Sequence, residues 1–242
     1  MSTHPHDLPD WLVADDRRES SPHVYPAGDR RVQPIDTVVI HWTASPYQPR
    51  GPLGADEARI RSWGRGERGE TSTHFTVLRD GTVLQLAPLS ARPWHAGGSK
   101  TADGRGAVNG RSIGIDLENV GPLHFQPAPS GGHFANAYGG VHRGPVWSDG
   151  KGGEWEPYTA PQMHALLTLA QALSHLAPQL ADPAVWVGHC DIRRTKLDPG
   201  PAFPWPWLQA VVAGGASPMD VTDWTAVPGV VVPLPAVPEG VA

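Results

Sequence analysis

Three short apolar runs constrain the fold of this chain more than any other feature of its sequence. They are residues 36–42 (DTVVIHW), 112–120 (SIGIDLENV) and 184–189 (AVWVGH). Each run is rich in β-branched residues and has the length of a strand rather than that of a helix. Segments with helical periodicity separate them, which is typical of sheets whose connections cross over one face. The runs therefore predict an α/β domain.

Helix and turn signals occupy the segments between these runs. Residues 159–176 begin with a Thr-x-x-Gln capping box, and their apolar residues recur at helical spacing. Residues 73–87 contain two β-rich stretches joined by Asp80-Gly81, which is the strongest short hairpin signal. Because a hairpin pairs its strands antiparallel, the predicted fold is a mixed central β-sheet flanked by helices. Shorter helices are predicted at residues 54–66 and 206–214.

The length of 242 residues predicts one domain with appendages. We expect residues 1–20 to form a surface segment, residues 21–213 the domain and residues 214–242 an extended tail. The counts of 28 Gly and 27 Pro are high, and they predict long irregular connections. Residues 121–157, rich in Gly, His and Trp, are too long for an ordinary connection. We interpret them as an insertion that forms a lid or a mobile loop.

Charge and apolar content exclude several classes of partner. A net charge of −5 creates no field that would gather nucleic acid. No segment approaches about 18 apolar residues, so no membrane partner is expected. The N-terminus lacks signal-peptide features and the single cysteine rules out an internal disulfide, so we expect cytoplasmic synthesis. We also expect a monomer. A local basic run is interpreted as a solvated helix face; it comprises Arg59, Arg61, Arg65 and Arg68.

Two histidines end apolar strands in the predicted sheet. If the strands of His41 and His189 are neighbours that point the same way, both imidazoles reach one edge of the sheet. Asp198, in the loop that follows the second strand, can complete a triangle with them. Two imidazoles and a carboxylate, with a fourth position left for water, are the ligand set of a catalytic zinc site. The sequence therefore predicts Zn²⁺ at the strand ends.

Four segments occur in the order TVVIHWTAS, STHFTVLRDGTVLQLAPLSARPWHAGGS, NGRSIGIDLEN and GHCDIRRTKLDPGPAFPW. Together they closely resemble the type 2 N-acetylmuramoyl-L-alanine amidases, which include phage lysozyme-like amidases, muropeptide-recycling amidases and peptidoglycan recognition proteins. The resemblance covers about residues 21–213. It implies a zinc hydrolase that cleaves the amide bond between N-acetylmuramic acid and L-alanine in peptidoglycan or a muropeptide.

The resemblance also implies roles for single residues. It implies that His41, His189 and Asp198 are the zinc ligands and that Lys196, two residues before the last ligand, is the catalytic lysine. A catalytic lysine beside the metal would donate a hydrogen bond to the oxyanion formed during amide cleavage. Asp116 occupies the position of the family's catalytic acid, which is usually a glutamate. This acid would accept a proton from the attacking water and deliver it to the leaving nitrogen.

The identity of the acid and of the substrate-binding residues stays open at this point. Aspartate is one methylene shorter than glutamate, so Glu118, on the same face of the strand by alternation, is the reserve candidate. Family branches without the acid use a tyrosine where this chain has Thr73, which favours the acid-dependent branch. The resemblance also predicts substrate contacts; these fall on Trp94, His95 and Asn109. For His95, a position behind a metal ligand and simple packing are the alternatives.

Three rival interpretations have a definite basis in the residues. Cys190, beside His189, could act as a thiol nucleophile, although strand neighbours point to opposite faces. The chain could also be a peptidoglycan-binding module that has the fold without the chemistry, but Asp198 argues against this. The equal spacing of three histidines in the insertion suggests a second metal site, but we expect their side chains to be solvated; they are His124, His133 and His142.

For the biological setting we expect wall lysis, with release at lysis or by another secretion route. Muropeptide recycling is the alternative.

Overall fold

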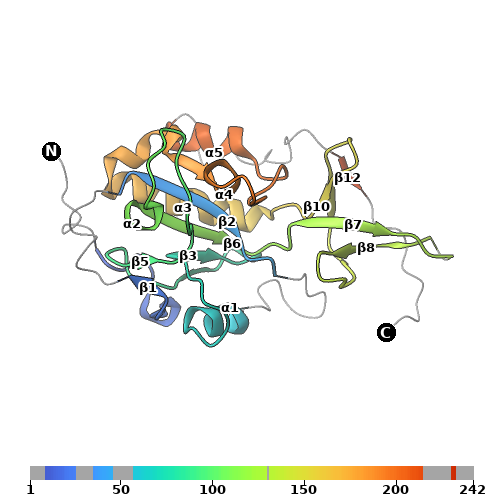
Figure 1. Cartoon of the computed structure of the whole chain (residues 1–242), viewed down its shortest axis with the longest axis horizontal. Helices are drawn as coiled ribbons and strands as arrows, with labels where there is room; N and C mark the ends of the chain where they lie inside the picture. Colours follow the sequence, from blue (N-terminus) through green and yellow to red (C-terminus); the bar gives the residue numbers. More distant parts are fainter. Residues whose placement is uncertain (1–8, 26–34, 46–56, 130, 215–229, 233–242) are drawn as a thin grey trace.

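The computed structural model describes residues 9–25, 35–45, 57–129, 131–214 and 230–232. Its centre is a five-stranded sheet, of order β11-β2-β6-β3-β4 (Figure 1). The first four strands are parallel neighbours, and β4 pairs antiparallel with β3 at one edge. The predicted mixed sheet is therefore confirmed. The bounds of its strands are Trp186–Gly188 for β11, Thr37–Trp42 for β2, Ser112–Leu117 for β6, Phe75–Val77 for β3 and Val83–Gln85 for β4.

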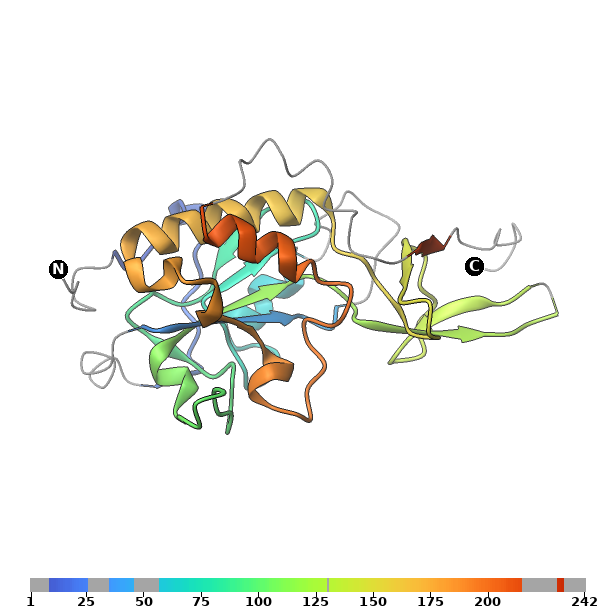
Figure 2. The same ribbon diagram turned by 90° about the horizontal axis from the view of Figure 1, so that it is seen from above.

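One face of this sheet carries the main hydrophobic core. Alternate residues of β2, Val38 and Ile40, pack with Ile113 and Ile115 of β6 in a single buried cluster. Helices α3 (Ala160–Leu176) and α5 (Trp205–Val212) lie side by side over this face (Figure 2). Because side chains alternate along a strand, the intervening residues of β2 and β6 point to the opposite face.

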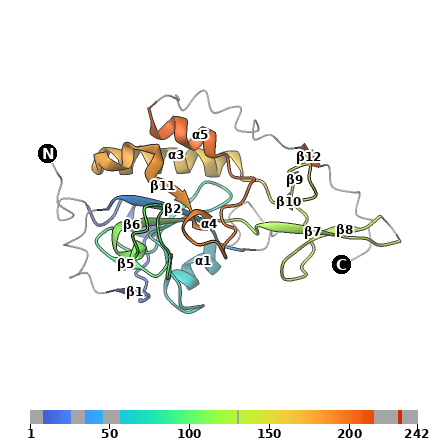
Figure 3. The same cartoon turned by 45° about the horizontal axis from the view of Figure 1, so that its top comes forward.

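The opposite face carries the polar residues of the strands. His41 of β2 is in register with Asp116 of β6, so the two side chains lie on this face as neighbours. Gly114 is also on this face, and a Cβ there would come within 2.8 Å of Thr73 and 2.7 Å of His95. Short helices lie on this side, which is less completely covered than the core face (Figure 3). They are α1 (Glu57–Gly64), α2 (Val108–Arg111) and α4 (His189–Ile192).

Residues 121–157 differ from the prediction of a lid or a mobile loop. They form most of a second five-stranded antiparallel sheet, of order β12-β9-β10-β7-β8, which projects from the central domain (Figure 1). A small apolar cluster that includes Leu123, Phe134 and Val146 supplies its core. One strand comes from the predicted tail. The bounds are Pro122–Gln126 for β7, His133–Asn136 for β8, Val146–Ser148 for β9, Glu154–Trp155 for β10 and Val230–Val232 for β12.

A buried ion cluster lies where the second sheet joins the central one. The Arg79 guanidinium donates to Glu118 at 2.6 Å and to Glu156 at 2.7 Å, and all three side chains are at most 4% exposed. Arg79 also donates to the Ser45 carbonyl at 2.9 Å, and the Val120 N–H donates to Glu156 at 2.6 Å. The cluster therefore ties the hairpin loop, the end of β6 and the return of the insertion together.

The remaining predicted elements are confirmed with shifted bounds. The capping box at the start of α3 is present, because the Gln162 N–H donates to Thr159 Oγ1 and the Thr159 N–H donates to Gln162 Oε1. The predicted helix 54–66 corresponds to α1, while residues 54–56 lie outside the described residues. Short elements complete the fold: 3₁₀ turns Asp15–Arg17, Pro178–Ala181 and Pro183–Val185, and the paired strands β1 (Val24–Tyr25) and β5 (Arg92–Pro93).

Two further expectations concern the whole chain. In the part of the chain that the structure describes, no helix has both the length and the apolar character needed to span a membrane. The division into residues 1–20, 21–213 and 214–242 stays a prediction. Within the first of these segments, Leu12 and Glu19 already contact the central domain, through Gln85 and Arg61 respectively.

Candidate active site

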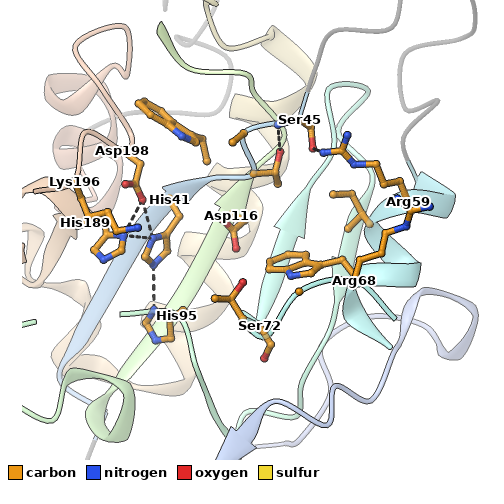
Figure 4. A pocket seen from close by; sticks show the side chains of 17 residues that line it. His41, Ser45, Arg59, Arg68, Ser72, His95, Asp116, His189, Lys196 and Asp198 are labelled. Carbon is orange, nitrogen blue, oxygen red and sulfur yellow. Dashed lines mark hydrogen bonds and ion pairs between the residues drawn. The ribbon is translucent and has the colours of Figure 1, made fainter. Parts of the chain in front are cut away.

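The predicted ligand triad converges at the polar face of the central sheet. The Nδ1 atoms of His41 and His189 lie 3.1 Å apart, and Asp198 Oδ2 lies 2.9 Å from the first and 3.0 Å from the second (Figure 4). These side chains come from β2, α4 and the loop after α4, 157 residues apart at most. Among the described residues, this is the group of His, Cys, Asp and Glu side chains that could hold a metal ion.

Backbone contacts explain how distant residues reach one point. Strands β2 and β11 are parallel neighbours, so both chains arrive at the same edge of the sheet. The expected strand end at His189 is wrong by one residue, because β11 ends at Gly188 and His189 begins α4. The Cys190 N–H donates to the Asp198 carbonyl at 3.0 Å, and the Tyr158 hydroxyl donates to the Pro199 carbonyl at 2.8 Å. These two bonds hold the loop that presents the carboxylate.

The chemistry of the triad fits a divalent metal. The edges of the triangle measure about 3 Å, close to the ~3.3 Å that separates ligand atoms around a tetrahedral ion with bonds of ~2.0 Å. Burial opposes ionisation of Asp198, but the neighbouring imidazoles of His189 and His41 hold its pKa far below the ordinary range. Burial lowers the pKa of His41, against the raising effect of Asp198. The carboxyl is thus ionised and the imidazole neutral, as metal binding requires.

A second hydrogen-bond chain orients the His41 ring. Ser112 Oγ donates to the Val108 carbonyl at 2.6 Å and lies 3.0 Å from His95 Nε2, which must therefore be the donor of that pair. His95 Nδ1 is then an acceptor for His41 Nε2, 3.0 Å away. This arrangement leaves His41 Nδ1 without a proton and directed at the triad. Of the roles predicted for His95, the hydrogen bond with His41 fits a residue that orients a metal ligand. Substrate contact by His95 stays a prediction.

Asp116 lies beside the triad and has no cationic partner among the described residues. It lines the same pocket as His41, His189 and Asp198, and only 7% of its surface is exposed. Burial raises the pKa of the Asp116 carboxyl well above its ordinary value, and the negative charge of Asp198 raises it further, while Thr73 lowers it. A carboxyl with a raised pKa keeps its proton to higher pH than an ordinary carboxyl, which suits a group that transfers protons.

The expectation that Glu118 shares the strand face of Asp116, which made it the reserve acid, is wrong. Strand β6 ends at Leu117, and the Glu118 carboxylate turns to Arg79, which donates to it from its guanidinium at 2.6 Å and from its backbone N–H at 2.9 Å. Glu118 does not line the pocket. An acid bound in this way is a structural charge, so Asp116 is the acid that the pocket offers.

Two predicted substrate contacts also lie outside the pocket. The Trp94 ring packs beside the rings of His23 and Tyr25, with centroids 5.4 and 5.7 Å away. Asn109 Oδ1 accepts the Ala96 N–H at 2.7 Å, which holds the loop that carries His95. Both residues therefore shape the surroundings of the site without lining it. A sequence motif marks such supporting residues and contact residues alike, which is why the prediction did not separate them.

The pocket has a volume of about 520 Å³ and brings together groups that the sequence left apart (Figure 4). Lys196 lies on the side of the triad, as predicted, and is exposed. Arg59 and Arg68 line the pocket as well. Arg68 is exposed in the loop after α1, whereas Arg59 is half-buried, so the interpretation of the basic run as a solvated helix face is wrong for Arg59. The spacing of Arg59 and Trp63 could have revealed this, because residues four apart share one face of a helix.

The rival nucleophile and the rival metal site receive no support from the geometry. Burial raises the pKa of the Cys190 thiol to about 11, and the negative charges of Asp191 and Asp198 act in the same direction. Such a thiol is protonated at neutral pH and is a poor nucleophile. His124 is exposed on β7, His133 is half-buried on β8, and the buried His142 ring contacts the Pro145 carbonyl. No metal-binding group forms among these described histidines.

Comparison with known proteins agrees with this geometry. The N-acetylmuramoyl-L-alanine amidase family matches residues 31–201. The 1,6-anhydro-N-acetylmuramyl-L-alanine amidase AmpD of Salmonella typhimurium is 30% identical over 225 residues, covering 85% of this chain and 95% of that enzyme. The N-acetylmuramoyl-L-alanine amidase AmiD of Escherichia coli is 29% identical over 187 residues, covering 72% of this chain and 52% of AmiD.

Solved structures show the same relationship. A crystal structure of AmpD superposes with a TM-score of 0.58 at 26% identity, covering 88% of this chain and 99% of AmpD. A complex of Escherichia coli AmiD with anhydro-N-acetylmuramic acid-L-Ala-D-γ-Glu-L-Lys gives a TM-score of 0.51 at 26% identity, covering 82% of this chain and 62% of that one. The chain belongs to the N-acetylmuramoyl-L-alanine amidase family and is a hydrolase of that class.

Proposed function

We propose that this chain hydrolyses the amide bond between N-acetylmuramic acid and L-alanine with one Zn²⁺ ion held by His41, His189 and Asp198. The observation that carries the proposal is the convergence of three buried ligand atoms within 3.1 Å of one another, with Asp116 in the same pocket. Two imidazole nitrogens and one carboxylate oxygen suit zinc among the common metals, and three protein ligands leave a position open for catalysis.

Each group in the pocket can then be given a task. A bound zinc ion lowers the pKa of its water to about 7 and polarises the substrate carbonyl. Asp116 accepts the proton of the attacking water and delivers it to the leaving nitrogen, a task that its raised pKa supports. Lys196 is exposed on the rim beside Asp198 and can donate a hydrogen bond to the carbonyl oxygen as negative charge develops there. His95 keeps the His41 ring in place.

The substrate that we propose is a small 1,6-anhydro-muropeptide. The support comes from relatives: AmpD is named for this substrate and is matched over 95% of its length, and AmiD has been solved with an anhydro-muramyl peptide. The initial expectation of wall lysis is kept as a second candidate, because the second sheet projects from the domain and could contact a polymer (Figure 1). The second sheet does not line the pocket, so it gives weaker support. The monomeric state stays a prediction.

A two-substrate assay tests the function and separates the candidates. The zinc-loaded protein is incubated with a purified anhydro-muropeptide and with purified sacculi, and the freed peptides are identified by mass. We expect peptides that begin with L-alanine, released faster from the muropeptide. Chelation should abolish release and zinc should restore it, whereas a thiol alkylator at pH 7 should have no effect because Cys190 stays protonated. Chelation-resistant turnover would refute the metal mechanism.

A further inference from the structure

Two arginines form the wall of the pocket that faces the triad. Arg59, half-buried on α1, and Arg68, exposed in the loop after α1, lie across the pocket from His189 and Asp198, with Asp116 between (Figure 4). Arg59 donates to Ser45 Oγ at 2.8 Å. Among the described residues, neither guanidinium forms an ion pair with a carboxylate. Two positive charges therefore face the cavity, and the part of the chain that the structure describes places no carboxylate within ion-pair distance of either.

The other two arginines of the same run are paired. Arg61 contacts Glu57 at 2.8 Å and Glu19 at 3.1 Å, and Arg65 contacts Glu67 at 2.7 Å. Neither of them lines the pocket. The run therefore divides into two arginines that stabilise α1 and its surroundings and two that are available to a ligand. An anion is the ligand class that two unpaired guanidinium groups select.

We propose that Arg59 and Arg68 bind the free carboxylates of the stem peptide and so fix the direction in which the substrate lies. This proposal rests on the proposed function. In that substrate the lactyl carboxyl is part of the scissile amide and the sugar carries no charge, so every negative group belongs to the peptide. The substrate solved with AmiD contains γ-linked D-glutamate. A γ linkage leaves the α-carboxylate of that residue free.

The distance along the substrate favours a partner away from the triad for this carboxylate. The α-carboxylate follows the scissile carbonyl by two residues, roughly 7 Å in an extended chain. A cation on the far wall, rather than Lys196 beside Asp198, meets this requirement. The peptide therefore runs from the triad toward α1, and the sugar lies on the side away from α1.

The Arg59 side chain is already held in place by a hydrogen bond before a ligand binds. Ser45, which accepts its hydrogen bond, is fully buried, and its backbone is held by Asn119 and Arg79. A guanidinium held before the ligand arrives loses less side-chain freedom on binding. Trp63 and Ile60 of α1 also line the pocket and contribute apolar surface to it. The ion cluster at Arg79 thus supports the substrate wall as well as the second sheet.

The test compares two substrates that differ at one group. One is an N-acetylmuramoyl peptide with L-Ala-D-γ-Glu-L-Lys, and the other carries a carboxamide in place of the D-glutamate α-carboxylate. For the carboxylate substrate, Arg59→Gln and Arg68→Gln should each raise KM about 10-fold or more with little change in kcat, since one charge-assisted hydrogen bond is lost. For the carboxamide substrate the increase should be less than about threefold. Arg65→Gln, on the paired side of the run, is the matched control.

A binding measurement keeps this inference separate from the proposed function. The affinity of the free peptide L-Ala-D-γ-Glu-L-Lys and of its carboxamide analogue is measured by calorimetry, which needs no turnover. Arginine-dependent loss of affinity for the carboxylate peptide alone supports the inference even if the protein cleaves neither substrate. Equal losses for both peptides, or no loss in either arginine variant, would overturn it. Thermal melting of each variant verifies that α1 remains folded.

Discussion

Two carboxylates of one strand region, Asp116 and Glu118, experience opposite surroundings. Glu118 receives two hydrogen bonds from Arg79, which also holds Glu156, so its charge is neutralised inside the protein. Asp116 is also buried, receives no cation from the described residues, and lies beside the negative charge of Asp198. The first arrangement resembles a structural ion cluster, and the second resembles a catalytic acid. The presence or absence of a cationic partner therefore distinguishes the structural carboxylate, Glu118, from the carboxylate suited to catalysis, Asp116.

The largest effect is expected at the triad that faces Asp116. Asp198→Ala removes the ligand with the negative charge, so we expect zinc affinity to collapse and turnover to fall at least about 10³-fold. Equilibrium dialysis against zinc and the amidase assay measure the two effects. A variant that keeps full zinc occupancy and turnover would contradict the ligand assignment. The fold should survive, because the loop backbone is still held through Cys190 and Tyr158.

The two carboxylates can be compared directly by neutral substitutions. Asp116→Asn should lower kcat about 10²- to 10⁴-fold while zinc remains bound, because the proton acceptor is lost. Glu118→Gln should leave kcat within about threefold when it is assayed well below its melting temperature. If Glu118→Gln gives the larger loss of kcat, the comparison between the two acids is reversed and Asp116 is not the catalytic acid.

The same Glu118→Gln variant should show its effect in stability. Removing one charge of a buried cluster leaves Arg79 incompletely paired, which costs about 3 kcal/mol in the free energy of unfolding. For a chain of this size, this corresponds to a fall of roughly 6 to 12 °C in melting temperature. Calorimetry of the zinc-free protein measures it, with Glu67→Gln, an exposed partner of Arg65, as the matched control. Equal melting temperatures would show that the cluster is not structural.

His95 tests how firmly the pocket holds its ligands. His95→Ala removes the acceptor of the His41 Nε2–H, so we expect zinc affinity to fall about 10- to 100-fold. Competition with a chelating dye measures this affinity without turnover. His95→Gln can restore an acceptor near the same position and should recover part of the loss. Unchanged affinity in His95→Ala would show that the ring of His41 is held by packing alone.

The sequence predicted more of the central sheet and triad than of their surroundings. The strands, the helix that begins at Thr159 and the convergence of His41 with His189 follow from short-range patterns and parallel pairing. The second sheet was missed because β9 and β10 have three and two residues, and β12 comes from the distant tail. The partner of Glu118 lies 39 residues away, so no local pattern shows that this acid is neutralised.

The smallest expected effect is the pH dependence that Asp116 gives to the zinc-free protein. Its pKa in the folded state is raised above the ordinary value of 3.8, so the folded state retains the proton to higher pH than the unfolded state. This contribution to stability is complete below about pH 3.8 and is lost as the pH rises toward the folded pKa, at no more than about 1.4 kcal/mol per pH unit.

The difference between wild type and Asp116→Asn isolates this term, because the other titratable groups are the same in both proteins. Urea unfolding between pH 4 and 8 should show the wild type losing stability relative to the variant as the pH rises. A constant difference would mean that Asp116 ionises normally in the fold. In that case burial without a counter-charge would not have raised the pKa of Asp116. The two acids would then differ only in the hydrogen bonds that they receive.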